Sequence, residues 1–149
     1  MRENTSVLVS FRKVMKLYDQ HMEEIRKIHQ LSSIEITIIS FLYNNPGKDT
    51  ARDISEMRML PKGNVSQGVD SLIHKSLLKR TPDTEDRRKI HLALTELAIP
   101  IVQKIDLLKE AFQQQLFQGF SQEELQIYAA LNARIIENSS KGFERNEET

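Results

Sequence analysis

Residues 77–96 read LLKRTPDTEDRRKIHLALTE, and this stretch decides the fold. Ile90, Leu92 and Leu94 alternate with smaller or polar residues, and this period of two predicts a strand. Leu77–Thr81 supplies the expected partner strand, and the polar loop Pro82–Lys89 connects the two. The stretch therefore predicts a β-hairpin with a charged, arginine-containing tip, in a chain whose remaining patterns are helical.

Upstream of the hairpin, two capping signals predict two helices. Ser32-Ser33-Ile34-Glu35 reads as a capping box, in which the Ser32 hydroxyl and the Glu35 carboxylate satisfy backbone donors of a helix that runs to about Asn44. Asn45-Pro46-Gly47 ends that helix. Thr50, with Asp53 three residues later, opens a short second helix that ends near Arg58-Met59-Leu60.

A third helix is predicted to begin at Pro61, which suits a first turn because its missing N–H costs nothing there. Its apolar stripe consists of Val65, Val69 and Leu72, and its opposite side presents Gly63, Asn64, Gln67, Asp70, Ser71 and His74. The order helix, short helix, helix, strand, basic loop, strand is that of a winged helix-turn-helix, whose third helix enters the DNA major groove. Asn and Gln can pair bidentately with adenine there, although the same polar face is also typical of an ordinary solvated surface.

Longer helices flank this module. Apolar residues spaced by three and four predict one helix running to about His29, and a second that begins at the Thr95 cap and ends at Gly119. Pro100 is expected to kink that second helix. Ser121-Gln122-Glu123-Glu124 caps a last helix to about Asn138, and residues 144–149 are expected to form a frayed tail.

Composition limits the possible functions. The formal net charge is 0, but the stretch from Arg58 to His91 carries eight basic and four acidic residues, whereas the stretch from Asp106 to Thr149 carries four and eight. A basic module in an acidic frame favours a nucleic-acid ligand. The chain has no cysteine and no long apolar run, so we expect a cytoplasmic protein without thiolate metal or redox sites. No nucleophile, phosphate-loop or zinc-protease motif indicates an enzyme, and no cofactor is expected.

From Leu31 to about Ile101 the chain resembles the MarR family of winged helix-turn-helix regulators. The family has a Pro-Gly turn, a Thr-capped helix, a wing that reads roughly Arg-x-x-Asp-x-x-Asp-x-Arg, and a strand that ends in Leu-Thr. This chain offers Pro46-Gly47, Thr50, the run from Arg80 to Arg88, and Leu94-Thr95. The resemblance implies a mainly α fold with a small β-hairpin wing, in a single domain over residues 1–149. Residues 31–95 would form the DNA-binding lobe, and residues 1–30 and 96–143 the dimerisation helices.

The resemblance also implies the DNA contacts. Asp86 and Arg88 would form the aspartate–arginine pair of the wing, in which the carboxylate orients a guanidinium that enters the minor groove. The full set of expected DNA-binding residues is Lys62, Gly63, Asn64, Ser66, Gln67, Arg80, Asp86, Arg87, Arg88 and Lys89. A solvated charged turn is the alternative interpretation of the wing.

Four positions depart from the family pattern. The family has Leu-Gly where this chain has Arg58-Met59, Gly where it has Ser76, and a larger residue where it has Gly68. Gly63 and Gly68 lie inside the predicted third helix, where each costs roughly 1 kcal/mol relative to Ala. Either close approach to DNA or tight packing against a neighbouring helix would explain them.

The function that follows is a sequence-specific transcriptional regulator, a ligand-responsive repressor that binds a pseudo-palindromic operator as a homodimer. A winged-helix module that docks an acidic protein partner is the alternative. The resemblance implies a small aromatic or amphipathic effector, and we name Met15, Tyr18, Met22 and Phe41 as candidate lining, although stripe residues are more often core. His21 and His29 lie eight residues apart, which is not the spacing of a helical ligand pair, so no metal site is predicted.

Overall fold

The computed structural model describes residues 2–147, with side-chain detail for residues 6–141. It is mainly helical, with one two-stranded antiparallel sheet, as the sequence predicted. The elements are α1 (Arg2–His29), α2 (Ser33–Asn44), α3 (Ala51–Arg58), α4 (Lys62–His74), β1 (Leu78–Pro82), β2 (Ile90–Leu94), the short 3-10 helix η1 (Glu96–Ala98), α5 (Ile99–Leu116) and α6 (Gln122–Glu147). The chain forms two compact units that divide after Phe112. Within residues 2–147, no helix is both long and apolar enough to cross a membrane.

Three helix starts have the predicted capping boxes. Ser32 and Glu35 exchange hydrogen bonds with each other's backbone N–H at the start of α2, and Thr50 and Asp53 do the same at α3. Ser121 and Glu124 repeat the arrangement at the start of α6. Each box satisfies two backbone donors that a helix N-terminus otherwise leaves open. Local sequence alone thus sets where these helices begin.

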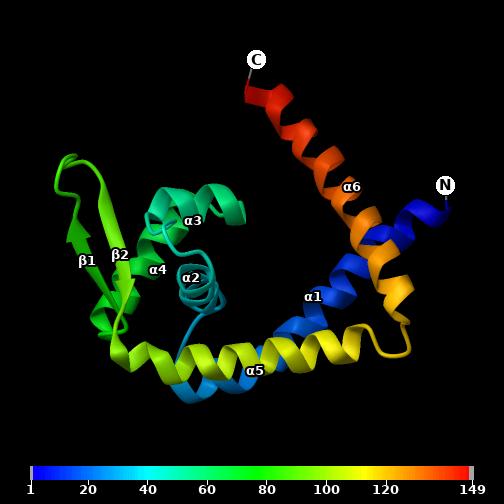
Figure 1. Ribbon diagram of the computed structural model, residues 1–149, viewed down its shortest axis with the longest axis horizontal. Helices are drawn as coiled ribbons and strands as arrows, with labels where there is room; N and C mark the ends of the chain where they lie inside the picture. Colours follow the sequence, from blue (N-terminus) through cyan, green and yellow to red (C-terminus); the bar gives the residue numbers. More distant parts are fainter. Residues whose placement is uncertain (1, 148–149) are drawn as a thin grey trace. The chain divides into compact units, whose positions relative to one another are not determined.

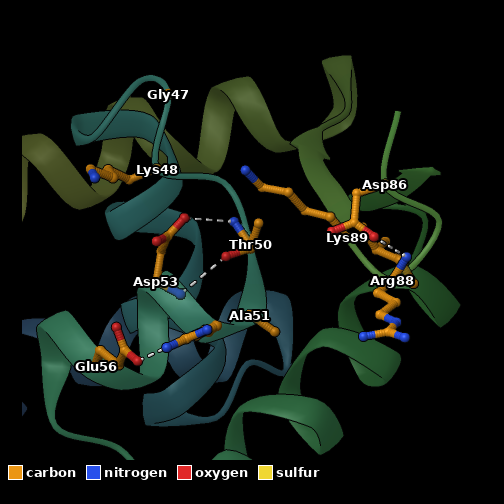
Figure 2. Close-up of a pocket in the computed structure, with 11 residues that line it drawn as sticks. Gly47, Lys48, Thr50, Ala51, Asp53, Glu56, Asp86, Arg88 and Lys89 are labelled. Atoms are coloured by element: carbon orange, nitrogen blue, oxygen red, sulfur yellow. Dashed lines mark hydrogen bonds and ion pairs between the residues drawn. The ribbon is translucent and has the colours of Figure 1, made fainter. Parts of the chain in front are cut away.

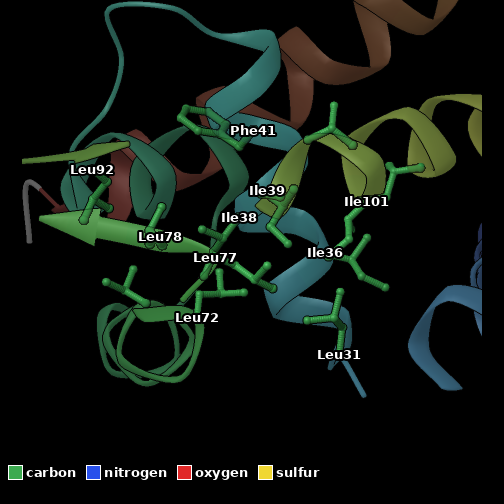
Figure 3. Close-up of a cluster of buried hydrophobic side chains, with 14 of the residues drawn as sticks. Leu31, Ile36, Ile38, Ile39, Phe41, Leu72, Leu77, Leu78, Leu92 and Ile101 are labelled. Carbon is green, nitrogen blue, oxygen red and sulfur yellow. The ribbon is translucent and has the colours of Figure 1, made fainter. Parts of the chain in front are cut away.

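The first unit holds the core. Helices α2, α3 and α4 gather beside the β1–β2 hairpin (Figure 1), and the wing strands lie over α4 (Figure 3). Ile38, Ile39 and Phe41 of α2 meet Leu72 of α4 and Leu92 of β2 in one buried cluster. Burial of each such side chain contributes about 1.5–3 kcal/mol relative to exposure. This cluster fixes α4 and the wing on a common base.

The hairpin pairs Leu78 with Leu94 and Pro82 with Ile90, so β1 lies one residue later than the predicted Leu77–Thr81. A further strand-like contact extends the sheet, because the N–H of Leu92 donates to the carbonyl of Asp49 at 2.7 Å. The loop between α2 and α3 is thereby attached to the wing through the backbone.

Three expectations about the later helices need correction. Pro100 does not kink a helix, because η1 precedes it and α5 begins at Ile99, which places Pro100 in a first turn that needs no N–H from it. Thr95 does not cap with its side chain, and its hydroxyl donates instead to the carbonyl of Ser76. Helix α6 continues to Glu147 rather than ending near Asn138, so the first part of the expected tail has helical backbone; Glu148 and Thr149 lie outside the described residues.

Candidate nucleic-acid interface

Helix α4 presents a polar face to solvent. Val65, Val69 and Leu72 are buried, as the predicted stripe required. The first turns expose the side expected to meet DNA, which consists of Lys62, Gly63, Asn64, Ser66 and Gln67. The helix therefore offers a base-reading surface of one cation, amide groups and a hydroxyl, mounted on an apolar base.

The two glycines of α4 have different roles. A Cβ on Gly68 would lie 2.7 Å from Cδ1 of Ile38 and 3.4 Å from Cγ2 of Ile34, so Gly68 lets α4 pack closely on α2. A Cβ on Gly63 would meet nothing within 4 Å. Of the two explanations open from sequence, packing therefore applies to Gly68, and Gly63 leaves open space at the exposed start of α4.

A buried carboxylate holds α4 against α2. Glu35 is only 4% exposed, and Nζ of Lys75 lies 2.9 and 3.1 Å from its two carboxylate oxygens. The Ser71 hydroxyl donates to Glu35 at 3.1 Å, and Lys75 also donates to the carbonyl of Gln30. Burial acts to raise the pKa of Glu35, but the hydrogen bonds from Lys75 and Ser32 outweigh it and lower the pKa. The carboxylate is thus ionised and fully bonded, and it fixes the rotation of α4 about its axis.

The wing turn is ordered by two aspartates. Oδ2 of Asp83 accepts the N–H of Glu85 and of Asp86, at 3.2 and 2.8 Å. Oδ1 of Asp86 accepts the N–H of Arg88 at 3.0 Å (Figure 2). Among the ion pairs of residues 6–141, none joins Asp86 to the Arg88 guanidinium, so the carboxylate orients Arg88 through its backbone. The turn exposes Arg87, Arg88 and Lys89.

An ion pair joins the wing to α4. The guanidinium of Arg80 on β1 bonds the carboxylate of Asp70 on α4. Both side chains are substantially exposed, at 46% and 65%, so the pair contributes little stability by itself. It does neutralise a carboxylate on the face expected to meet phosphates, and it fixes the direction of Arg80.

His91 joins the wing to the loop before α3. Its Nε2 lies 2.7 Å from Oδ1 of Asp83, and its Nδ1 lies 2.7 Å from Oδ1 of Asp49. The hydrogen bond to Asp83, and then that to Asp49, raises the pKa of His91. His91 in turn lowers the pKa of Asp83 to about 2, together with the backbone bonds from Asp86 and Glu85.

A hollow of about 790 Å³ lies between the wing turn and the start of α3 (Figure 2). Its charged lining includes Lys48, Arg52, Arg88 and Lys89. Its acidic members are Asp53, Glu56 and Asp86, and each already has a partner within the chain. A smaller hollow, of about 370 Å³, lies beside Asn64 and Gln67, between α4 and the start of α2. The basic lining of the first hollow continues the cationic wing toward the loop between α2 and α3.

All ten residues predicted to bind DNA are exposed, and all lie on α4, on β1 or in the wing turn.

The four candidate effector residues are placed differently. Met22 and Phe41 are fully buried core residues, Tyr18 is half-buried and packs edge to face on Phe112, and Met15 is 57% exposed. None of the four lines either hollow described above. No cluster of three metal-ligating side chains occurs among the described residues.

The sequence interpretation missed the contacts that connect the elements. Asp70 was counted only as part of a polar face, and Asp49, His91, Glu35 and Lys75 were given no role in the interface. One signal was available for His91: it alternates with Ile90 and Leu92 on β2, which places a titratable ring on the side of the strand away from Leu92. Its two partners lie 8 and 42 residues away, and no local pattern identifies them.

Comparisons with known proteins identify the same architecture. Residues 29–89 match the family model described as MarR family, a span that contains α2, α3, α4 and the wing turn. The chain is 25% identical over 114 residues to YkoM, an uncharacterized HTH-type transcriptional regulator of Bacillus subtilis (strain 168); the match covers 76% of this chain and 73% of YkoM.

Solved structures share the fold over most of the chain. A structure of the S. aureus MepR–DNA complex has a TM-score of 0.76 at 21% identity, with 87% of this chain and 96% of that chain covered. Bordetella bronchiseptica BpsR, described in a structure on the regulation of its DNA binding by 6-hydroxynicotinic acid, has a TM-score of 0.73 at 17% identity, with 89% and 91% covered. At these identities, the likeness shows a shared fold.

Proposed function

We propose that the chain is a DNA-binding winged-helix transcriptional regulator of the MarR family, and that it is a ligand-responsive repressor that binds a pseudo-palindromic operator as a homodimer. It is a regulator and not an enzyme. The observation that carries the proposal is the joint exposure of a base-reading helix face and a basic wing turn on one lobe.

The contacts within the lobe support specific DNA reading. Glu35 fixes the rotation of α4, and Asp70 fixes Arg80, so the polar face and the wing are held in a set geometry before DNA arrives. Asn64 and Gln67 are the side chains suited to pair with bases, whereas Arg87, Arg88 and Lys89 are suited to phosphates and the minor groove. We assign base recognition to the first group and positioning to the second.

The flanking helices support a homodimer. No side chain of α6 between residues 122 and 141 is buried, although Ile127, Tyr128, Leu131, Ile135 and Ile136 are all at least 44% exposed. A long helix with an unburied apolar stripe gains most of its stability from a partner. A second copy of the chain would cover the stripe and present two recognition helices about 34 Å apart, one DNA turn, to the two halves of a palindrome.

The proposed response to a small ligand is supported by the similarity of this fold to that of BpsR. BpsR, which shares this fold, is described as regulated in its DNA binding by 6-hydroxynicotinic acid. We propose a small aromatic or amphipathic effector for this chain as well. Release of labelled DNA on addition of a panel of small aromatic acids tests this, and binding that no member of the panel alters would contradict it.

The DNA-binding experiment begins with a duplex selected by the wild-type protein from a random-sequence library. Binding of this labelled duplex is titrated at several salt concentrations. If Arg88 contacts DNA in both subunits, Arg88→Ala lowers the magnitude of the slope of log K against log[salt] by about 2 × 0.9, or 1.8. Lys13→Ala, which removes an exposed cation on α1, is the matched control and leaves the slope unchanged. Equal slopes for the two variants would remove the wing from the interface.

Asp86→Ala separates two roles of its carboxylate. If the Asp86 carboxylate acts only by repelling DNA phosphates, the variant binds DNA more tightly than the wild type. Loss of the bond from Asp86 to the N–H of Arg88 predicts weaker binding, because the turn that directs Arg88 loosens. We expect weaker binding, and tighter binding would show that the turn needs no ordering by Asp86.

A further inference from the structure

His91 occupies a position that neither the family resemblance nor the proposed DNA contacts explain. It lies on β2, is about one-third exposed, and places each ring nitrogen 2.7 Å from a carboxylate oxygen. One carboxylate, that of Asp83, belongs to the wing turn. The other, that of Asp49, belongs to the loop before α3. The ring thus bridges two segments that carry exposed cations, Lys48 on the loop and Arg88 and Lys89 on the wing.

The geometry requires a charged ring. A neutral imidazole has one N–H, so it can donate to one carboxylate and must direct a lone pair at the other. Only the imidazolium donates from both nitrogens. At 2.7 Å on each side, the structure is that of an imidazolium held by two carboxylates.

Two carboxylates dominate the electrostatic surroundings of the His91 ring. Thr81, opposite His91 on β1, carries no charge, and the groups that act electrostatically on His91 are Asp49 and Asp83. Asp83 accepts backbone N–H bonds with its other oxygen, so the turn fixes it independently. The loop side is fixed by the backbone bond from Leu92 to Asp49.

We propose that His91 is a positioning residue for DNA binding: by bridging Asp83 and Asp49 it docks the wing on the loop before α3, and it does so fully only while its ring is protonated. The inference rests on the proposed DNA contacts of the wing. Deprotonation leaves one carboxylate facing a lone pair, and the wing turn then loses one of the side-chain attachments that set the direction of Arg88 and Lys89.

The direction of the pH effect follows from the shifted pKa values of His91 and Asp83. The pKa of His91 is raised, so the bridge contributes in full below the ordinary histidine value of about 6.5 and is lost as pH rises through the raised pKa. The pKa of Asp83 is lowered to about 2, so its contribution is present above its ordinary value and is lost only in strong acid. The docked wing is therefore complete from about pH 4 to pH 6.5 and loosens in the alkaline direction.

The first test needs no DNA. The ring proton signals of the four histidines are followed by NMR from pH 5 to pH 9, and His91→Gln identifies the signal of residue 91. We expect the midpoint of His91 to lie above the ordinary histidine value of about 6.5, and Asp49→Asn to move it to lower pH. Asp49→Asn keeps the backbone bond to Leu92, so a shift reports the carboxylate itself. A midpoint that Asp49→Asn leaves in place overturns the bridge.

The second test measures DNA affinity with the duplex selected from the random-sequence library. For the wild type, we expect the ratio of Kd at pH 8 to Kd at pH 6 to exceed that of His91→Gln by roughly threefold to tenfold, the effect of one hydrogen bond. His29→Gln is the matched control, because His29 is exposed at the end of α1, outside the proposed DNA contacts, and its loss leaves the bridge intact. Thermal unfolding at pH 6 verifies that each variant is folded.

The two proposals fail in different ways. A wild-type protein that binds no duplex at any salt concentration contradicts DNA binding through the wing, and the NMR titration then still decides whether the bridge exists. A wild-type protein that binds DNA with the same pH ratio as His91→Gln overturns the positioning role. A pH ratio that His29→Gln abolishes and His91→Gln preserves overturns it as well, and assigns the effect to the end of α1.

Discussion

The lobe formed by α2, α3, α4 and the wing differs from helix α6 in how much of its apolar surface is buried within one chain. In the lobe, Ile38, Phe41 and Leu72 are buried, and the buried Glu35 has a full set of partners. Among residues 6–141, no buried side-chain polar atom is left without a hydrogen bond. In α6, by contrast, Leu131 and Ile135 are exposed by about half. The lobe buries its apolar side chains within one chain, whereas we propose that a second copy of the chain covers the exposed stripe of α6.

This difference separates two kinds of residue. Changes within the lobe should act on folding or on DNA binding at any protein concentration. Changes on the apolar stripe of α6 should act on assembly, and on DNA binding only through assembly. The following experiments test that separation, from the largest expected effect to the smallest.

The largest effect is expected from the double variant Leu131→Lys, Ile135→Lys. Two apolar side chains that a dimer would bury become charged, so about 3–6 kcal/mol of association free energy is lost and the dimer Kd rises by at least about 100-fold. Light scattering across a concentration series measures the mass. Gln126→Lys with Ala133→Lys adds the same charge at exposed positions on the opposite side of α6 and serves as the control. A double variant that remains dimeric would place the interface elsewhere.

Ile38→Ala should destabilise the lobe by about 2–5 kcal/mol, because it leaves a cavity beneath Gly68 at a fully buried site. Urea denaturation measures the free energy of unfolding at several protein concentrations. The expected loss is independent of concentration. Ile127→Ala, at a position 60% exposed on α6, should change stability only where the protein is dimeric. A concentration-dependent loss for Ile38→Ala would show that the lobe itself needs the partner.

Gln67→Ala should weaken binding to the selected duplex by about 1–3 kcal/mol if Gln67 pairs with a base, and should leave binding to random duplex nearly unchanged. Fluorescence anisotropy with both duplexes measures the ratio. The dimer mass should stay that of the wild type, in contrast to the α6 variant. Equal losses on the two duplexes would reassign Gln67 to phosphate contact.

Met59→Gly should stabilise the lobe by about 0.5–1 kcal/mol. Met59 ends α3 at φ 53 and ψ 48, a conformation that costs an L-residue roughly 1–2 kcal/mol, and its side chain is 64% exposed. Thermal unfolding shows the gain. The reverse change, Gly47→Ala, meets open space at φ +86 and should destabilise for conformational reasons alone. The same sign for both variants would show that side-chain contacts, not backbone conformation, decide these positions.

The sequence best predicted the features that depend on residues close together in the chain. The capping boxes at Ser32, Thr50 and Ser121, the buried stripe of α4 and the strand β2 each involve residues within a few positions of one another, and the structure confirms them. Within β2, Leu92 is buried but Ile90 is exposed, so the predicted alternation holds only in part. The family match likewise confirms the architecture of the lobe.

What the sequence could not supply were contacts between elements. Glu35 and Lys75 are 40 residues apart, and Asp49 and His91 are 42 residues apart. Nothing in either segment encodes the position of the other, because the contact exists only after the core has set the distance between them. Oδ1 of Asp86 accepts the backbone N–H of Arg88, a contact that the sequence did not predict, and the pairing of Asp86 with the Arg88 guanidinium stays a prediction. Fold thus follows from local pattern here, and the fine geometry of the interface follows from packing.

Two hydrogen bonds join the base of the hairpin to the segment that leads into α5. The N–H of Thr95 donates to the carbonyl of Leu77, and the Thr95 hydroxyl donates to the carbonyl of Ser76. The hairpin is therefore held at several points: its base beside the start of α5, and its length by the Arg80–Asp70 ion pair to α4 and by His91 to the loop before α3. A displacement at the start of α5 would thus be transmitted to the wing and to α4 together.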